Sequence, residues 1–257
     1  MGRGSPPSLY VEALIRADLD ALWERTQEPA AHQRWDLRFT EIDYLPAAPD
    51  EPRRFRYATR VLPFLTIAGT GVSAGEKRRP DGTRTSALRF ASPHPLSLLA
   101  EGSGYWRYVP TGDGVRFLTG YDYRPRWGRW GALADRLLLR PLMGWATAWS
   151  FDRLRLWLER GISPRRGLAH GLCEAVVRAL VVVAAGLLAE PASGALLALM
   201  AALGATVLAC LVPPLPTTPA ARRCLRTPPV PVRAPRVLDR LAVPTDHHPA
   251  DSEEPHA

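Results

Sequence analysis

Hydrophobic and polar residues alternate over most of the first half of the chain, and long apolar runs replace this alternation after residue 164. Alternation with a period of two is typical of β-strands with one buried face, because successive side chains point to opposite sides. Turn signals separate the segments, as at 111–114 (Thr-Gly-Asp-Gly), which is typical of a hairpin. The pattern predicts two short helices after the first strand, and strands at residues 8–15, 39–44, 53–61, 65–73, 83–91, 100–109 and 115–123.

The predicted strands have two chemically different faces. Arginines such as Arg56, Arg89 and Arg107 alternate with aromatic or aliphatic residues. The sequence therefore predicts one antiparallel sheet with an arginine-rich outer face, which either faces solvent or rests on anionic phospholipid. The inner face is aromatic and is expected to line a ligand cavity, although aromatic stripes are also typical of an ordinary core. Its aromatic residues are Tyr57, Phe90, Trp106, Tyr108, Phe117 and Tyr121.

A long helix is predicted from Asp135 to Arg160, because this stretch is rich in Leu, Ala, Arg and Trp and does not alternate. Its apolar residues fall on two nearly opposite sides. One interpretation is a core helix that is kinked near Pro141. In the other, the second half closes the domain while the first half, with Trp127 and Trp130, touches lipid. One side carries Leu138, Leu142, Trp145 and Trp149, and the other carries Phe151, Leu154 and Leu158.

Two apolar segments, at about 168–189 and 194–212, are predicted to cross a membrane. The second is uncharged, and as a helix it is about 28 Å long, which is enough to span the hydrocarbon layer. The first contains Glu174 and Arg178, which are four residues apart and are expected to pair on one side of the helix. The short connection between the segments predicts an antiparallel helical hairpin.

Positive residues flank both ends of this hairpin, which by the positive-inside rule places both ends in the cytoplasm. The chain begins without the apolar stretch of a signal peptide, so the domain at 8–161 is expected in the cytoplasm. The Pro-rich segment 213–257 is predicted to be a disordered cytoplasmic tail. The predicted location is the cell membrane, with a multi-pass topology. The residues assigned to the membrane interface are Trp127, Trp130, Arg165, Arg166, Arg222 and Arg223.

Composition narrows the expected partners. The net charge is +8, and nearly all basic residues are arginine, a bias that with abundant Ala, Pro and Leu suggests a bacterial genome of high GC content. No basic run has the spacing of a nucleic-acid-binding motif, so lipid or membrane is expected and nucleic acid is not. The three cysteines have neither disulfide-framework nor zinc-ligand spacing, and no metal or other cofactor is expected. His247 and His248 are interpreted as part of the solvated tail.

No catalytic signature with characteristic spacing is found in the chain. His32 and Asp36 are four residues apart and share a face if their stretch is helical, which makes them a candidate acid/base pair. The alternative is an aspartate that caps a helix beside a surface histidine. Neither a nucleophile elbow nor a phosphate-binding glycine loop is present in the sequence.

The order of the predicted elements is strand, two short helices, further strands and one long helix. The first helix starts at 18–23 (Asp-Leu-Asp-Ala-Leu-Trp), and the second ends at Trp35-Asp36 after Pro29. Over residues 8–161 this order resembles the START-like superfamily, also called SRPBCC or polyketide cyclase-like. The resemblance implies an α+β helix-grip fold, in which a curved antiparallel sheet surrounds a long C-terminal helix. It also implies a cavity between sheet and helix that holds a hydrophobic or amphipathic molecule. The transmembrane helical hairpin is not part of the usual pattern.

The favoured function is membrane-tethered binding of a hydrophobic or amphipathic small molecule, such as a lipid, an isoprenoid or a polyketide-like compound. In this hypothesis Trp145 and Trp149 either cap the cavity or reach the bilayer. The first alternative is a cyclase- or hydrolase-like enzyme acting on such a molecule, which requires a buried carboxylate or histidine at the cavity. The second is a membrane adaptor that uses the arginine-rich face and the tail. The sequence favours binding over catalysis and leaves the ligand and the oligomeric state open.

Overall fold

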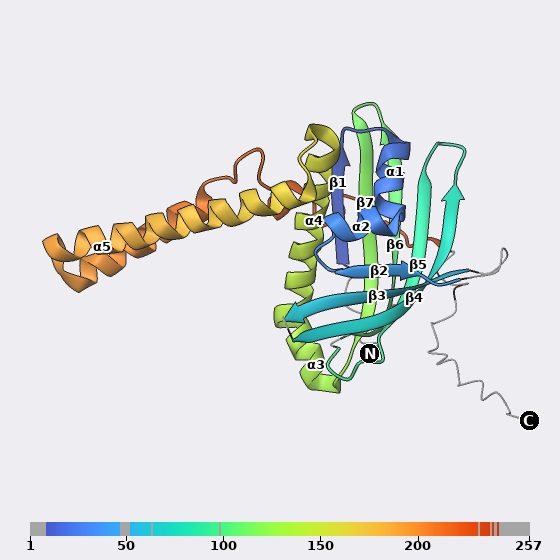
Figure 1. The fold of residues 1–257 in the computed structure, drawn as a ribbon, viewed down its shortest axis with the longest axis horizontal. Coiled ribbons are helices and arrows are strands. Elements are labelled where there is room, and N and C mark those ends of the chain that lie inside the picture. The colour runs from blue at the N-terminus through green and yellow to red at the C-terminus, as the bar shows by residue number, and fades with distance from the viewer. Residues whose placement is uncertain are drawn as a thin grey trace, which may run out of the picture.

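A computed structural model of the protein describes residues 9–46, 52–62, 64–97, 99–230, 232–236, 238 and 241. A seven-stranded antiparallel sheet packs one face against a long helix (Figure 1). The strand order is β1-β7-β6-β5-β4-β3-β2, so β1 closes against the last strand and every other pairing joins chain neighbours. This arrangement confirms the predicted α+β helix-grip fold. The strands are β1 Leu9–Ile15, β2 Glu41–Tyr44, β3 Arg53–Leu62, β4 Leu65–Arg78, β5 Arg84–Ala91, β6 Leu99–Thr111 and β7 Gly114–Pro125.

Two short helices, α1 (Leu19–Gln27) and α2 (Pro29–Trp35), connect β1 to β2. Asp18 caps α1 by accepting hydrogen bonds from two backbone N–H groups of its first turn. Pro29 starts α2, at a position where its missing N–H removes no helical hydrogen bond. Trp35 at the other end of α2 is fully buried. The two helices therefore deliver the segment after Trp35 to the interior of the domain.

The long helix consists of three consecutive segments: α3 (Gly128–Ala134), the π-helix η1 (Asp135–Leu139) and α4 (Arg140–Arg160). In η1 the N–H of Arg140 donates to the carbonyl of Asp135, five residues earlier. Pro141 follows in the first turn of α4. A proline inside a helix cannot donate to the preceding turn, and a π-helical turn is one way to accommodate that loss. The irregularity that the sequence places near Pro141 is thus a π-helical turn just before it.

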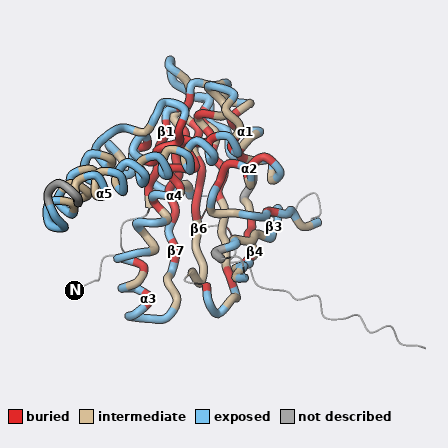
Figure 2. The backbone as a smooth tube through the Cα atoms, turned by 60° about the vertical axis from the view of Figure 1, so that its left-hand side comes forward, coloured by how far each residue is buried: buried red, intermediate tan, exposed pale blue. Residues whose placement is uncertain are grey.

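The core lies between α4 and the part of the sheet that is formed by β1, β7 and β6 (Figure 2). Phe151 of α4 stacks on Phe117 of β7, with 4.4 Å between the ring centroids. Leu154, one turn later, is also fully buried. Burying side chains of this size stabilises a fold by roughly 1.5–3 kcal/mol each. The second half of the long helix therefore closes the domain.

The helix α5 (Pro164–Leu211) is two helices that meet at Gly194, whose φ of 77° and ψ of 170° break the helical geometry. They span Pro164–Ala189 and Gly194–Leu211, and each is long and apolar enough to cross a membrane. Both point away from the sheet and lie side by side as a hairpin (Figure 1). We call them the apolar hairpin.

A polar contact holds the base of the apolar hairpin together. Arg178 on the first helix donates to the carboxylate of Glu174, as the spacing of these residues predicts. Arg178 also donates to the carbonyls of Val212 and Pro213, at 3.0 and 3.2 Å. The ion pair therefore ties the first helix to the end of the second, where the last carbonyls of a helix lack intrahelical donors.

After the apolar hairpin the chain returns to the sheet and crosses its outer face. Leu225 pairs with Glu12 of β1 through two backbone hydrogen bonds of 2.9 Å. Leu238 and Leu241 are buried in a second apolar cluster on this face. We call residues 213–230, 232–236, 238 and 241 the strap. The prediction of a disordered tail is wrong for the strap, whereas His247 and His248 lie outside the described residues.

The strap binds because the outer face is not uniformly polar. Tyr10, Val72, Ala87, Tyr105 and Leu118 form an apolar patch between the arginines, and the strap covers it. The arginines contribute as hydrogen-bond donors to strap carbonyls: Arg107 to Arg233 at 3.0 Å, and Arg89 to Leu238 at 3.2 Å. Part of the arginine-rich face therefore contacts the chain itself rather than solvent or lipid.

Candidate functional site

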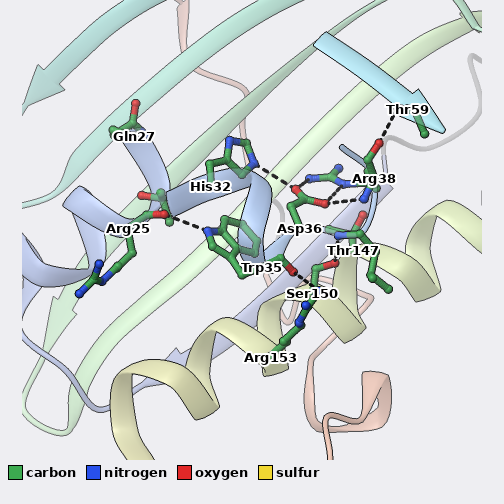
Figure 3. Close-up of polar contacts among 12 residues, drawn as sticks. Arg25, Gln27, His32, Trp35, Asp36, Arg38, Thr59, Thr147, Ser150 and Arg153 are labelled. Carbon is green, nitrogen blue, oxygen red and sulfur yellow. Dashed lines mark hydrogen bonds and ion pairs between the residues drawn. The ribbon is translucent and has the colours of Figure 1, made fainter. Parts of the chain in front are cut away.

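A buried polar cluster follows the end of α2 and lies beneath α4 (Figure 3). The carboxylate of Asp36 is fully buried and accepts two hydrogen bonds from one edge of the Arg38 guanidinium, at 2.9 Å from Nε and 2.6 Å from Nη2. Nε2 of His32 lies 3.2 Å from the same carboxylate. The backbone N–H of Arg38 donates to Asp36 as well. Because Arg38 follows Asp36 by two residues, the Asp36 carboxylate can bind both the backbone and the side chain of Arg38, and it thereby fixes the turn that leads to β2.

The charges of this cluster follow from its contacts. Burial disfavours an ionised Asp36, but the positive charge of Arg38 and the hydrogen bonds from Arg38 and His32 outweigh it and hold the pKa of Asp36 well below its usual range. Burial also lowers the pKa of His32, against the opposing pull of Asp36. At neutral pH the cluster therefore contains a carboxylate, a guanidinium and a neutral imidazole.

Further hydrogen bonds join this cluster to α4. The hydroxyl of Ser150 accepts from the N–H of Leu37 at 3.0 Å. Arg153 donates to the carbonyl of Trp35, at 3.4 Å, and to that of Pro164 at the start of α5, at 2.8 Å. The same guanidinium therefore fixes both the cluster and the base of the apolar hairpin to the long helix (Figure 3).

His32 is a core residue. Its ring lies within 4.8–5.4 Å of the rings of Trp35, Phe39 and Trp106, measured between centroids. The interpretation of His32 as a surface residue is therefore wrong, because α2 presents this side to the sheet. The structure does bring His32 and Asp36 together, and their acid/base role stays a prediction.

Arg38 marks the boundary between this buried cluster and a more open aromatic region. Its guanidinium carbon is 5.5 Å from the centroids of both Phe39 and Tyr121. Phe39 contacts Tyr57 of β3, which contacts Phe90 of β5. Phe39, Tyr57 and Phe90 are each only half-buried. We call these three residues the open aromatic region.

Glycines on neighbouring strands shape the open aromatic region. A Cβ atom at Gly69 would lie 2.4 Å from the Tyr57 hydroxyl, and one at Gly102 would lie 2.4 Å from the Phe90 ring. Both rings therefore lie flat across glycines, where any larger residue would displace them. The result is a shallow apolar face over β3, β4 and β5, the part of the sheet that α4 does not cover.

The aromatic residues that the sequence assigns to a cavity divide into four groups. Tyr57 and Phe90 belong to the open aromatic region. Tyr121 is buried and its hydroxyl lies 3.1 Å from that of Thr147, beside Arg38. Trp145 is 45 % exposed on the outside of α4. The remaining four, Trp106, Tyr108, Phe117 and Trp149, are part of the packed core cluster.

Arg38 and Phe39 were missed by the sequence analysis. Phe39 falls at the start of a predicted strand, where alternation carries no information about its neighbours. Arg38 is two residues after Asp36, a spacing that suits a local carboxylate–backbone turn, and this was the available signal.

The residues assigned to the membrane interface lie in two places. Trp127 and Trp130 are exposed at the start of the long helix, and Arg165 and Arg166 are exposed in the first turn of α5. Arg222 donates to the carbonyl of Val212. Arg223 instead binds the buried carboxylate of Asp152 at 2.9 Å, which gives it a structural contact within the domain. Among the described residues, no group of three or more His, Cys, Asp or Glu side chains is arranged to hold a metal ion.

Comparison with known proteins gives a relative of this chain by sequence. No family model matches the chain. The chain is 50 % identical over 159 residues to the uncharacterized membrane protein YndG of Bacillus subtilis (strain 168). That match covers 62 % of this chain and 59 % of the relative, so the chain spans less than two thirds of the relative's length.

Several solved structures are similar to the domain at low sequence identity. One is TTHA0849 from Thermus thermophilus, with a TM-score of 0.46, 17 % identity, and coverage of 61 % of this chain and 100 % of that one. Another is the STAR-related lipid transfer protein from Xanthomonas axonopodis, with a TM-score of 0.46, 20 % identity, and coverage of 62 % and 90 %. A third is the di-domain ARO/CYC protein StfQ, with a TM-score of 0.42, 14 % identity, and coverage of 59 % and 50 %.

Proposed function

We propose that this protein is a membrane-tethered domain that binds a hydrophobic or amphipathic small molecule on the open aromatic region. The observation that carries the proposal is a contrast within one face of the sheet. Over β1, β7 and β6 the inner face is filled by the side chains of α4, whereas the rings of Tyr57 on β3 and Phe90 on β5 stay half-buried. Aromatic and apolar side chains with a few polar groups are the usual lining of small-molecule sites.

Arg38 gives the open aromatic region a polar end. Its side chain is 12 % exposed, and it lies between the buried Asp36 carboxylate and the ring of Phe39. An amphipathic ligand would place its apolar part across Tyr57 and Phe90 and its polar part toward Arg38. This orientation favours lipid-like molecules with a polar or anionic end over purely apolar ones.

The apolar hairpin supplies the proposed tether. Both helices expose apolar side chains along their whole length and neither is buried against the domain. With both helices in a bilayer, the domain and the strap lie on the same side of the membrane. The exposed Arg165 and Arg166 favour the cytoplasmic side by the positive-inside rule.

Native mass spectrometry of the full chain, purified in detergent and incubated with extracted bacterial lipids, tests the binding. We expect a bound species of lipid mass on the wild-type protein. The Tyr57→Ala/Phe90→Ala variant is expected to lose occupancy by about 10-fold or more, because each ring buries a large apolar area against a ligand. The matched control is Leu14→Ala, an exposed apolar residue of β1. A wild-type protein that stays empty, or equal occupancy in all three proteins, contradicts the proposal.

A second candidate function is a cyclase- or hydrolase-like reaction on the same ligand, and the His32–Asp36 pair favours it. The pair is buried, its carboxylate is ionised, and its imidazole is neutral, which suits a general base. In such a reaction the ligand would have to reach the His32 ring, against which Phe39 packs with 5.4 Å between the ring centroids. The test is to recover the bound molecule from wild type and from His32→Gln: a chemical difference between the two supports catalysis, and identical molecules support binding alone.

A further inference from the structure

The first half of the long helix carries an exposed apolar surface that no described part of the chain covers. Trp130 is 79 % exposed and Leu137 is 69 % exposed, although both are among the most hydrophobic residue types. Large contiguous apolar patches on a surface mark interaction sites. We call this surface the stripe, and its residues are Trp127, Trp130, Leu133, Leu137, Leu138, Leu142 and Trp145.

The stripe is continuous with the base of the apolar hairpin. Trp145 stacks on Trp149, with 6.4 Å between their centroids. The Trp149 ring in turn lies against Gly171 in the first helix of the hairpin, where an added Cβ would be 3.3 Å from Cζ2. The line of exposed apolar residues on the long helix therefore ends where the hairpin leaves the domain.

The direction of the two elements suits a membrane surface. The apolar hairpin projects from one side of α4, and α3 and α4 run across its direction (Figure 1). When the hairpin crosses a bilayer, a helix in this orientation lies along the bilayer surface. An amphipathic helix in that position buries its apolar side at the boundary between headgroups and acyl chains.

Residue types within and beside the stripe favour lipid as its partner. Three of its seven residues are tryptophans, which are enriched at membrane–water interfaces. Arg129 and Arg136 are exposed on the same helical segment, where guanidinium groups can bind lipid phosphates. An interface with another protein would require a partner to fit against the base of the hairpin, where the bilayer itself must lie.

The backbone at the start of the helix holds Trp127 outward. Trp127 has a φ of 67°, in the left-handed region that bulky residues rarely adopt. Gly131 packs so closely on the preceding turn that a Cβ would lie 1.6 Å from the carbonyl oxygen of Arg126. The tight turn therefore places an aromatic ring at the end of the stripe in a strained backbone conformation. Exposure of that ring to solvent provides no interaction that would offset the strain.

We propose that the stripe docks on the same membrane leaflet that the apolar hairpin enters, as a second contact that fixes the orientation of the domain. Docking would place the end of the sheet next to α3 at the bilayer surface. Phe90 lies at that end. It pairs with Gly102 of β6, which pairs in turn with Tyr123, and Tyr123 is two residues before the end of β7. A lipid would then pass between the leaflet and the open aromatic region without crossing water. This inference rests on the proposed membrane tether and ligand site.

Tryptophan quenching in proteoliposomes tests the docking. The full chain is reconstituted in vesicles of phosphatidylcholine and phosphatidylglycerol, with and without lipids brominated near the headgroup end of their acyl chains. We expect bromolipid to quench wild-type emission, and we expect Trp127→Phe/Trp130→Phe/Trp145→Phe to lose at least half of the quenchable emission. The matched control is Trp23→Phe/Trp157→Phe, whose rings contact Tyr108 and the guanidinium groups of α1 and α2. This control is expected to keep the quenchable emission.

The outcomes separate the docking from the tether and from ligand binding. A chain that resists alkaline extraction but whose triple variant keeps its quenchable emission overturns the docking and leaves the tether intact. Extraction of the chain by alkali overturns the tether and the docking together. Ligand occupancy in detergent is measured independently of either result. Thermal unfolding of the triple variant in detergent, expected within about 2 °C of wild type for substitutions at exposed positions, shows that a lost signal is not caused by misfolding.

Discussion

The two halves of the long helix have similar apolar content and opposite environments. Residues 147–154 are buried against the sheet, whereas most residues between 127 and 142 are exposed. The difference begins at Gly144, whose nearest neighbour in the sheet is Leu9, the first residue of β1. Before that point the helix has run past the end of this strand. An apolar residue on a helix is therefore a core residue only where another element reaches it.

The two halves also differ in how their buried charges are paired. In the second half, Asp152 is fully buried and accepts from Arg155, Arg223 and the N–H of Ala220. In the first half, Asp135 accepts from the hydroxyl of Tyr123 and from Arg140. The first contact fixes the strap to the helix, and the second fixes the π-helical turn to β7. The helical segment that carries the stripe is thus attached to the sheet, although the stripe's own apolar side chains have no cover among the described residues.

The largest difference between the halves is expected from deleting an apolar side chain. Phe151→Ala removes a fully buried ring that stacks on Phe117, and we expect a loss of about 3–5 kcal/mol in the free energy of unfolding. Chemical unfolding of the full chain in detergent, followed by near-UV circular dichroism, measures it. A loss below about 1 kcal/mol would show that the domain is not closed by this half of the helix.

Breaking the buried charge contact should have a somewhat smaller effect. Asp152→Ala leaves Arg223 without its carboxylate and leaves Arg155 paired with Glu159 alone, and we expect a cost of about 3 kcal/mol. The control is the double variant Asp152→Ala/Arg223→Ala, in which one unpaired charge is removed and part of the loss is restored. Limited proteolysis of the strap reports the same contact, because Asp152 accepts from both Arg223 and the N–H of Ala220 in the strap. Unchanged protease resistance in Asp152→Ala would contradict the assigned role.

Alternation and turn signals predicted much of this fold because they report directly which face of a strand is buried. Trp106 was assigned to the inner face and its neighbour Arg107 to the outer face, and the structure agrees: Trp106 is in the core, and Arg107 donates to the strap. The strap could not be predicted in the same way, since its burial depends on an apolar patch assembled from five strands rather than on its own composition. The site was only partly predictable: His32 and Asp36 were paired by their helical spacing, but Arg38 joins them through a turn that has no periodicity.

The buried polar cluster at the end of α2 predicts that the stability of the protein depends on pH, with an effect smaller than those of the two substitutions above. Burial lowers the pKa of His32, so the unfolded chain binds a proton more readily than the folded chain as pH falls below about 6.5. The stability that comes from keeping His32 neutral is present above that pH and decreases on acidification. We expect the thermal midpoint of the wild-type chain to fall more between pH 7 and pH 5 than that of His32→Gln. Parallel curves for the two proteins would rule out a buried, neutral histidine.

The smallest effect is expected in the first half of the helix. Trp130→Ala and Leu137→Ala remove side chains that are 79 % and 69 % exposed, so in detergent each should change the free energy of unfolding by no more than about 0.5 kcal/mol. The same unfolding measurement that reports a large loss for Phe151→Ala checks this. A loss above about 2 kcal/mol would mean that another part of the chain covers these residues in solution. A small loss, combined with a loss of quenching by bromolipid, would show that the apolar residues of this half act on the bilayer and not on the fold.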